Sequence, residues 1–297
     1  MRPEIGFMKW LSQTLEQRAL IRSIVGGRLN EFRDLLDAGV QPSPAALIRA
    51  VCCAHDWSVV MVLDLLKAGA DPNWRRKDGR TALMVAVTGG RYDMVWQLLR
   101  AKANPNESDR QGMTALLLAC TVREGPLRKD FIVQDLVKAG AHVNARDRYG
   151  WTPLMWLAKN RRNNLYGDLL RAGADVNLKS KQGMTALMIA AASDPTGWNL
   201  SVEYLLRTAD KGTIDVNAQD ISGMTALMWA IAVNKGNDLG NIDRLLDAGA
   251  DPHIKDCTGR TALDMAGDMA DHIRRDFEER SKKDQRAGGG RQPKETL

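Results

Sequence analysis

Residues 150–155 read GWTPLM, and this phrase has five related copies along a chain of 297 residues. Every copy begins with glycine, has threonine two positions later and continues with alanine or proline and then leucine. The other copies are GRTALM at 79–84, GMTALL at 112–117, GMTALM at 183–188 and at 223–228, and GRTALD at 259–264. The six threonines are spaced by 33, 38, 33, 40 and 36 residues. Recurrence at a nearly constant interval predicts a stack of similar units.

Residues 147–177 show how one unit is expected to fold. Asp147 and Gly150 predict a turn, because aspartate starts turns well and glycine accepts a positive φ. Thr152 is a good N-cap, and Pro153 suits the first helical position, where an amide N–H would have no partner. The apolar residues that follow have helical spacing, so a helix begins directly after the turn.

A second helix is expected at about residues 165–171, after a polar break, and Gly173 suits the left-handed position that closes it. Neither helix buries its apolar face within the pair, so neighbouring pairs have to stack on one another. Each second helix contains a pair of leucines, except that the second residue of the pair at Leu136 is valine. The pairs begin at Leu35, Leu65, Leu98, Leu136, Leu169, Leu205 and Leu245. A charged last helix over 271–280 completes eight expected helix pairs, of which the first and last are caps.

These phrases and their flanks resemble the ankyrin-repeat family over about residues 16–280. The resemblance implies an all-α repeat solenoid, an ankyrin-repeat stack with a short finger turn before the helices. The expected organisation is an N-terminal extension at 1–15, the ankyrin-repeat domain at 16–280, and a polar, disordered C-terminal tail at 281–297.

Two departures from the family pattern carry predictions. The family's histidine after Thr-Pro-Leu hydrogen-bonds within the finger, and here it is Met84, Leu117, Met155, Met188, Met228 or Asp264. Methionine should keep the packing and lose that polar tie. Lys102 replaces the closing glycine of the other units. Because a left-handed lysine costs about 1 kcal/mol, we expect a distorted turn at Lys102.

The composition is that of an ordinary globular protein, with 26% charged and 44% apolar residues. The four cysteines, at positions 52, 53, 120 and 257, have no disulfide-like spacing, which favours free thiols in a reducing compartment. No segment has the apolar length of a signal peptide or a membrane span. We therefore expect a cytoplasmic protein with no membrane association; a bacterial effector exported by a dedicated machine would have the same composition.

No pattern of a catalytic or metal site occurs in the sequence. Histidines and cysteines lack metal-ligand spacing, and neither a phosphate-binding glycine loop nor a nucleophile elbow is present. Asp71, Asp175, Asp215 and Asp251 recur once per unit, which indicates a role in every loop and not one acid–base pair. We predict a non-enzyme with no catalytic residue, metal, cofactor or small-molecule substrate.

The resemblance places partner binding on a concave face formed by the fingers and the first helices. Arginine, lysine and aromatic residues, which make large anchors, gather at these positions. The candidates are Arg75, Arg76, Arg80, Arg110, Arg148, Tyr149, Trp151, Trp156, Lys159, Arg162, Lys181 and Trp229. The alternative is that the basic residues only keep the stack soluble and that Trp156 fills space between helices. Insertions near 123–130, 194–199 and 234–240 form a second candidate surface, with Trp198 as its anchor.

The leading hypothesis is a non-catalytic module, monomeric when free, that binds an acidic protein partner as an inhibitor, immunity protein or adaptor. A net charge of +6 also allows nucleic-acid binding, which we rank lower because the excess is modest for this length. A third hypothesis is a secreted effector that uses the same surface to bind a host protein.

Overall fold

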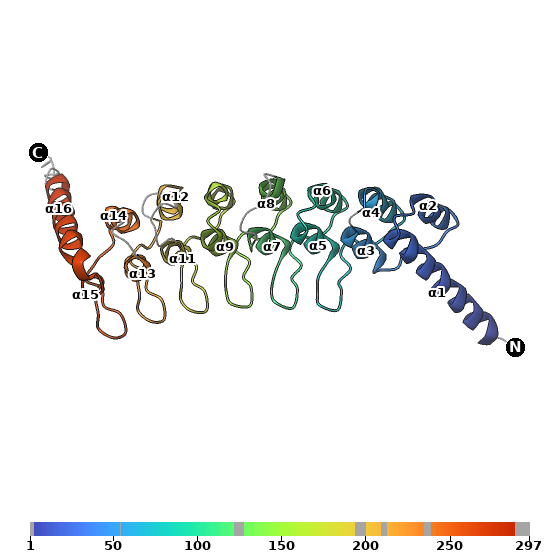
Figure 1. Ribbon diagram of the computed structural model, residues 1–297, viewed down its shortest axis with the longest axis horizontal. Coiled ribbons are helices and arrows are strands. Elements are labelled where there is room, and N and C mark those ends of the chain that lie inside the picture. The colour runs from blue at the N-terminus through green and yellow to red at the C-terminus, as the bar shows by residue number, and fades with distance from the viewer. Residues whose placement is uncertain are drawn as a thin grey trace, which may run out of the picture. The chain divides into compact units, whose positions relative to one another are not determined.

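The computed structural model describes residues 3–53, 55–121, 128–193, 200–208, 213–234 and 239–288, and these form helices joined by turns (Figure 1). By its internal contacts the chain divides into two compact units, Met1–Arg148 and Tyr149–Leu297. Within the described residues the helices form eight pairs, four in each unit, as the repeat count predicts. None of the described helices is long and apolar enough to cross a membrane.

Unit 1 is a row of four helix pairs. The pairs are α1 (Pro3–Val25) with α2 (Leu29–Asp37), α3 (Ala46–Cys52) with α4 (Ser58–Lys67), α5 (Ala82–Thr88) with α6 (Tyr92–Arg100), and α7 (Ala115–Thr121) with α8 (Arg128–Lys138). Each first helix packs on the first helix of the next pair, and each second helix packs on the next second helix. Unit 1 therefore has two layers of helices.

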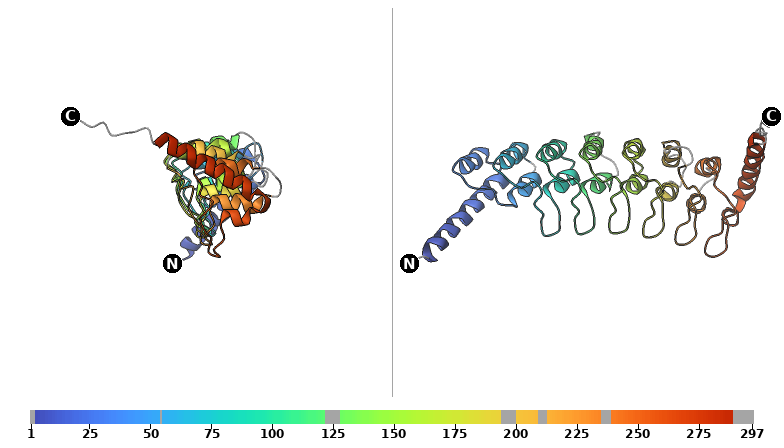
Figure 2. Two further views of the ribbon diagram at one scale, coloured as in Figure 1. Left: turned by 90° about the vertical axis from the view of Figure 1, so that its left-hand side faces the viewer. Right: turned by 180° about the vertical axis from the view of Figure 1, so that it is seen from behind.

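Unit 2 repeats this arrangement. Its pairs are α9 (Pro153–Asn160) with α10 (Tyr166–Arg171), α11 (Ala186–Ser193) with α12 (Ser201–Thr208), α13 (Ala226–Val233) with α14 (Gly240–Asp247), and α15 (Ala262–Met265) with α16 (Ala270–Gly288). Short 3-10 turns, Asn163–Leu165 and Gly267–Met269, lead into α10 and α16. The loops before α5 and α7 in unit 1, and before α11, α13 and α15 in unit 2, project from the side of the layer of first helices (Figure 2).

The leucine of the repeated phrase forms the centre of each layer. Leu83 and Leu116 in unit 1, and Leu154, Leu187 and Leu227 in unit 2, are at most 1% exposed. Burial of one such side chain stabilises the fold by about 1.5–3 kcal/mol. The equivalent Leu263 is half-buried, because α15 is the last first helix of the row.

The threonine of the phrase is an N-cap, as its position predicts. The side-chain oxygens of Thr81, Thr152 and Thr225 accept a hydrogen bond from the backbone N–H three residues later, each at 3.3 Å. A cap of this kind is worth about 1 kcal/mol.

Met155 and Met188, two of the methionines that replace the family's histidine, keep a weak polar contact, so for these two the predicted loss of the polar tie was wrong. The sulfurs of Met155 and Met188 lie 3.5 Å from the backbone nitrogens of Thr152 and Thr185, which donate to them. Thioether sulfur is a weak acceptor. In the last repeat Asp264 accepts instead, at 2.8 Å from the Thr261 nitrogen, and this bond lowers the pKa of the Asp264 carboxyl.

The turn at Lys102 is regular, so the predicted distortion was also wrong. Lys102 has φ 62° and donates its N–H to Leu99 at 3.0 Å, and the N–H of Ala103 reaches the Leu98 carbonyl at 2.9 Å. The equivalent bonds at Gly140 and Ala141 are both 3.0 Å. The two closing hydrogen bonds fix the left-handed backbone, and lysine adopts it at an energetic cost.

The once-per-unit carboxylates have the loop role that their recurrence predicts. Each accepts a hydrogen bond from the backbone N–H two residues later, at 2.8–3.2 Å, at Asp71, Asp175, Asp215 and Asp251. Asparagine side chains then join consecutive repeats: Asn217 Oδ1 accepts from the Asp251 N–H at 2.8 Å, and its Nδ2 donates to the Gly249 carbonyl at 3.1 Å. The loops are therefore tied to their neighbours by side chains.

Candidate protein-binding surface

Six fingers precede the six helices that carry the repeated phrase. We number them 1 to 6, for residues 74–80, 107–113, 145–151, 178–184, 218–224 and 254–260. Most fingers begin their turn with a side-chain oxygen that accepts two backbone N–H groups; Asp220 Oδ1, for example, accepts from Ser222 at 2.8 Å and Met224 at 3.0 Å. Asp256 does the same in finger 6, and bonds led by the Thr258 hydroxyl lower the pKa of its carboxyl to about 2.

Neighbouring fingers within a unit are joined edge to edge. The residue at the second turn position donates its backbone N–H to a carbonyl of the preceding finger. In unit 1 Arg110 donates to Asp78 at 3.2 Å; in unit 2 Ile221 donates to Gln182 at 3.1 Å and Cys257 to Ser222 at 2.9 Å. The fingers of each unit are therefore a hydrogen-bonded ladder that holds its outward side chains at fixed spacing.

Several predicted basic residues of unit 1 are bound within the ladder itself. Arg75 pairs with Glu107 at 3.1 Å and donates to the Ser108 carbonyl, and Arg80 lies 3.5 Å from the Asp109 carboxylate. Both contacts join finger 1 to finger 2. Arg76 lies 3.6 Å from Asp78 within its own finger. The charge of these three arginines is partly neutralised by the protein.

Other basic residues on this face of unit 1 are exposed. Lys77 and Arg110 in the fingers, and Arg49 at the end of α3, have no ion-pair partner in the part of the chain that the structure describes. Arg148 is exposed in finger 3, and its N–H donates to the Gln111 carbonyl at 2.8 Å. Among the candidate residues in the unit 1 fingers, Arg110 therefore keeps its charge without an ion-pair partner in the described part of the chain, as do Lys77 and Arg146 beside the candidates.

Aromatic residues gather at the start of unit 2. The rings of Trp151 and Trp156 lie 4.9 Å apart between centroids and are tilted by 49°, and both side chains are half-buried. Tyr149 is 46% exposed in the same finger.

Trp229 donates its indole N–H to the Asp220 carboxylate at 2.9 Å, which joins α13 to finger 5. Trp229 thus has a structural contact that the sequence did not indicate.

The basic candidates of unit 2 differ in exposure. Lys159 and Lys181 are exposed and have no ion-pair partner among the described residues. Arg162, in contrast, is only 9% exposed, in the connection between α9 and the following 3-10 turn. Because its side chain is buried there, Arg162 is removed from the candidate surface. Trp198 lies outside the described residues, as do most of the three insertions.

Comparison with known proteins identifies the family. A model for "Ankyrin repeats (3 copies)" matches residues 47–147, 123–215 and 162–256, which together cover more than half of the chain. The chain belongs to the ankyrin-repeat family. Among solved structures it is similar to "Crystal Structure of EF0377 an Ankyrin Repeat Protein", with 26% identity and a TM-score of 0.56, over 68% of this chain and 96% of that one. No curated protein matches.

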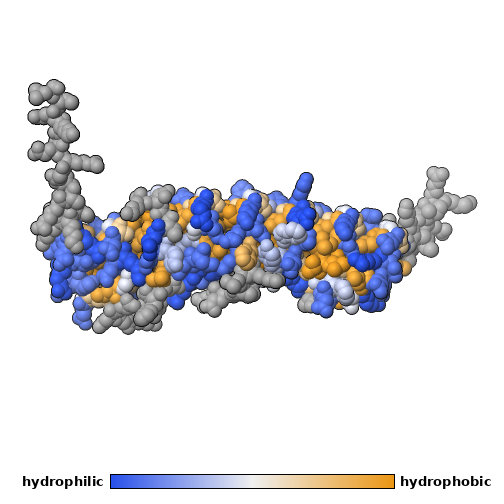
Figure 3. All heavy atoms as spheres, turned by 90° about the horizontal axis from the view of Figure 1, so that it is seen from above, coloured by the Kyte–Doolittle hydropathy of each residue, from blue (hydrophilic) through white to orange (hydrophobic). Residues whose placement is uncertain are grey.

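Ankyrin repeats are generally protein–protein interaction modules, and the ankyrin fold is typically a non-catalytic scaffold. The described residues contain no group of three or more histidine, cysteine, aspartate or glutamate side chains that could hold a metal ion. The face formed by the second helices shows a mixture of hydrophilic and hydrophobic residues (Figure 3).

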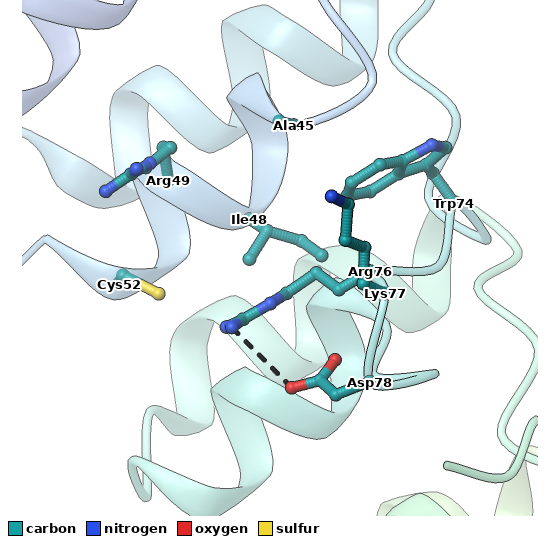
Figure 4. Close-up of a pocket in the computed structure, with 8 residues that line it drawn as sticks. All are labelled: Ala45, Ile48, Arg49, Cys52, Trp74, Arg76, Lys77 and Asp78. Atoms are coloured by element: carbon teal, nitrogen blue, oxygen red, sulfur yellow. Dashed lines mark ion pairs between the residues drawn. The ribbon is translucent and has the colours of Figure 1, made fainter. Parts of the chain in front are cut away.

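Unit 1 of this ankyrin-repeat protein also has a groove of about 440 Å³ between α3 and finger 1 (Figure 4). Ile48 projects from α3 toward the finger in this view. The lining residues are Ala45, Ile48, Arg49 and Cys52 from the α3 side and Trp74, Arg76, Lys77 and Asp78 from the finger. The α3 side of this groove was not predicted from the sequence. The sequence does contain a signal for it, because the segment 38–45 before α3 is too short to form a finger.

Proposed function

We propose that this ankyrin-repeat protein binds an acidic protein partner through its fingers and first helices, as a non-catalytic inhibitor or adaptor. The observation that carries the proposal is the exposure of Lys77 and Arg110 in unit 1, and of Lys159 and Lys181 in unit 2, without an ion-pair partner among the described residues. Unpaired charges on a surface favour a partner of complementary charge and speed its association.

The rigidity of the fingers supports the same proposal. Backbone hydrogen bonds within and between the fingers fix the finger backbone before a partner arrives, so binding loses little conformational entropy in the backbone. Tyr149, at 46% exposure, adds an aromatic side chain of the kind enriched at binding hot spots. The four cysteines are free thiols, which supports a reducing, cytoplasmic location.

A matched pair of triple variants tests the proposal. The first is Arg110→Glu, Lys159→Glu and Lys181→Glu on the finger side. The control is Lys138→Glu, Arg171→Glu and Arg207→Glu on the second helices, where each side chain is 76% exposed. Both variants change the net charge equally, so a general charge effect would appear in both.

The measurement is an affinity capture from nuclease-treated lysate of the source cell, read by mass spectrometry. We expect the native chain and the control to capture the same protein and the finger variant to lose it. Capture of the same protein by all three chains would show that the binding site does not include these residues. Loss in both variants would indicate attraction by net charge alone. If the native chain captures no protein, a titration with nucleic acid against salt follows, in which a steep fall of affinity with salt would favour nucleic-acid binding.

A further inference from the structure

Finger 1 is the edge of the finger ladder. Residues 38–45 lead from α2 into α3 without a finger, so the ladder of unit 1 begins at residue 74. In the following fingers the residue at the second turn position donates its N–H to the preceding finger, as Arg110 and Arg148 do. Lys77 occupies this position in finger 1, and its backbone N–H has no acceptor among the described residues.

The groove lies between α3 and finger 1, in a unit where no finger precedes finger 1 (Figure 4). Its charged lining consists of three basic side chains, Arg49, Arg76 and Lys77, and one carboxylate, Asp78. Since Arg76 lies 3.6 Å from Asp78, Arg49 and Lys77 are the cations left for a ligand. Its apolar lining is Ala45, Trp74 and the nearly buried Ile48, which is 5% exposed.

We propose that an extended acidic segment of the partner protein docks in this groove and takes the place of the missing finger. A backbone carbonyl of the segment accepts the Lys77 N–H, in the same way that each finger pairs with its neighbour. Carboxylates on either side of that carbonyl pair with Arg49 and the Lys77 side chain, and one apolar side chain contacts Ile48 and Trp74. This inference rests on the proposed function and names the subsite within it.

The size of the groove favours a short segment over a folded surface. A volume of about 440 Å³ is at the lower end of typical ligand pockets, about 300–1,000 Å³, and holds only a few side chains. Addition of an extended strand to an exposed backbone edge is a common mode of peptide recognition, in which main-chain bonds supply affinity and side-chain pockets supply specificity. The unpaired N–H and the two free cations fit this mode.

The test selects peptides from a random phage-displayed library on the full chain and measures the strongest binder by fluorescence anisotropy. The groove variant is Arg49→Glu with Lys77→Glu. Its control is Lys67→Glu with Lys138→Glu, two exposed lysines on second helices of the same unit. We expect selected peptides that carry aspartate or glutamate around an apolar residue, and a loss of affinity of about tenfold or more in the groove variant only.

Hydrogen exchange on the native chain provides a second measurement that does not depend on the folding of a variant. Saturating peptide should slow exchange of the Lys77 amide by about tenfold, because the N–H becomes hydrogen-bonded, and leave the Arg110 amide unchanged. Selected peptides without acidic residues, or acidic peptides that bind all three chains equally and leave the Lys77 amide unchanged, would overturn the groove site. The capture of a partner that depends on Arg110, Lys159 and Lys181 would still uphold the proposed function.

Discussion

Finger 1 and finger 5 have the same turn but use their polar groups in different ways. In finger 5 the Asp220 carboxylate accepts from two backbone N–H groups and the Trp229 indole, and the Ile221 N–H donates to the Gln182 carbonyl of finger 4 at 3.1 Å. In finger 1 the Lys77 N–H and side chain have no partner among the described residues. The polar groups of an interior finger are hydrogen-bonded within that finger and to its neighbours. The edge finger instead leaves the N–H and the ammonium group of Lys77 available for a ligand.

The largest expected effect comes from adding a methyl group inside the ladder. Gly223 has φ 78°, and a Cβ there would lie 2.7 Å from the Cys257 nitrogen. Gly223→Ala should reduce the free energy of unfolding by about 3 kcal/mol, from left-handed strain and steric overlap together. Gly259 has φ 84° with open space around a Cβ, so Gly259→Ala should cost only about 1 kcal/mol. Urea denaturation measures both; equal losses would show that the fingers are not closely packed.

The second effect compares the turn carboxylates of the two fingers. Asp220→Ala removes an acceptor of two backbone N–H groups and one indole N–H, so we expect a loss of about 2 kcal/mol and a change in Trp229 fluorescence. Asp78 accepts one backbone N–H, from Arg80 at 3.1 Å. Asp78→Ala should therefore cost about 1 kcal/mol or less. A larger loss for Asp78 than for Asp220 would reverse the comparison.

A smaller effect of opposite sign is expected outside the fingers. Lys102 adopts φ 62° with a regular pair of closing hydrogen bonds. Glycine accepts this backbone without strain, so Lys102→Gly should stabilise the protein by up to about 1 kcal/mol, less the entropy that glycine adds to the unfolded chain. Gly140→Lys places the same strain in the next repeat and serves as the reverse control. A destabilised Lys102→Gly protein would show that lysine contributes a contact of its own.

The smallest effect is the acid response of finger 6. The pKa of Asp256 is lowered to about 2 in the folded protein, below an unfolded value near 3.9, so its contribution to stability is complete above about pH 4. That contribution should be lost as the pH falls toward 2. Asp256→Asn should flatten this part of the stability curve relative to Asp37→Asn, an exposed carboxylate in α2. Identical curves for the two variants would remove Asp256 as the cause.

The sequence predicts the parts of this protein that are local and repeated. Thr81 and Thr152 mark the helix starts because a threonine N-cap needs only the next turn of its own chain. The turn glycines mark the fingers for the same reason. Arg75 and Arg80 were assigned to a partner because their acidic partners, Glu107 and Asp109, lie about one repeat away and depend on the stacking of fingers. The burial of Arg162 and the groove at α3 likewise depend on tertiary contacts.

The most direct measurement is the dissociation constant of the captured partner for the native chain and the two triple variants. For Arg110→Glu, Lys159→Glu and Lys181→Glu we expect affinity to fall by about 100-fold or more, because attractive contacts become repulsive. The Lys138→Glu, Arg171→Glu and Arg207→Glu control should stay within about threefold of the native value. Equal affinity for all three chains would contradict binding of an acidic protein by the basic fingers and first helices.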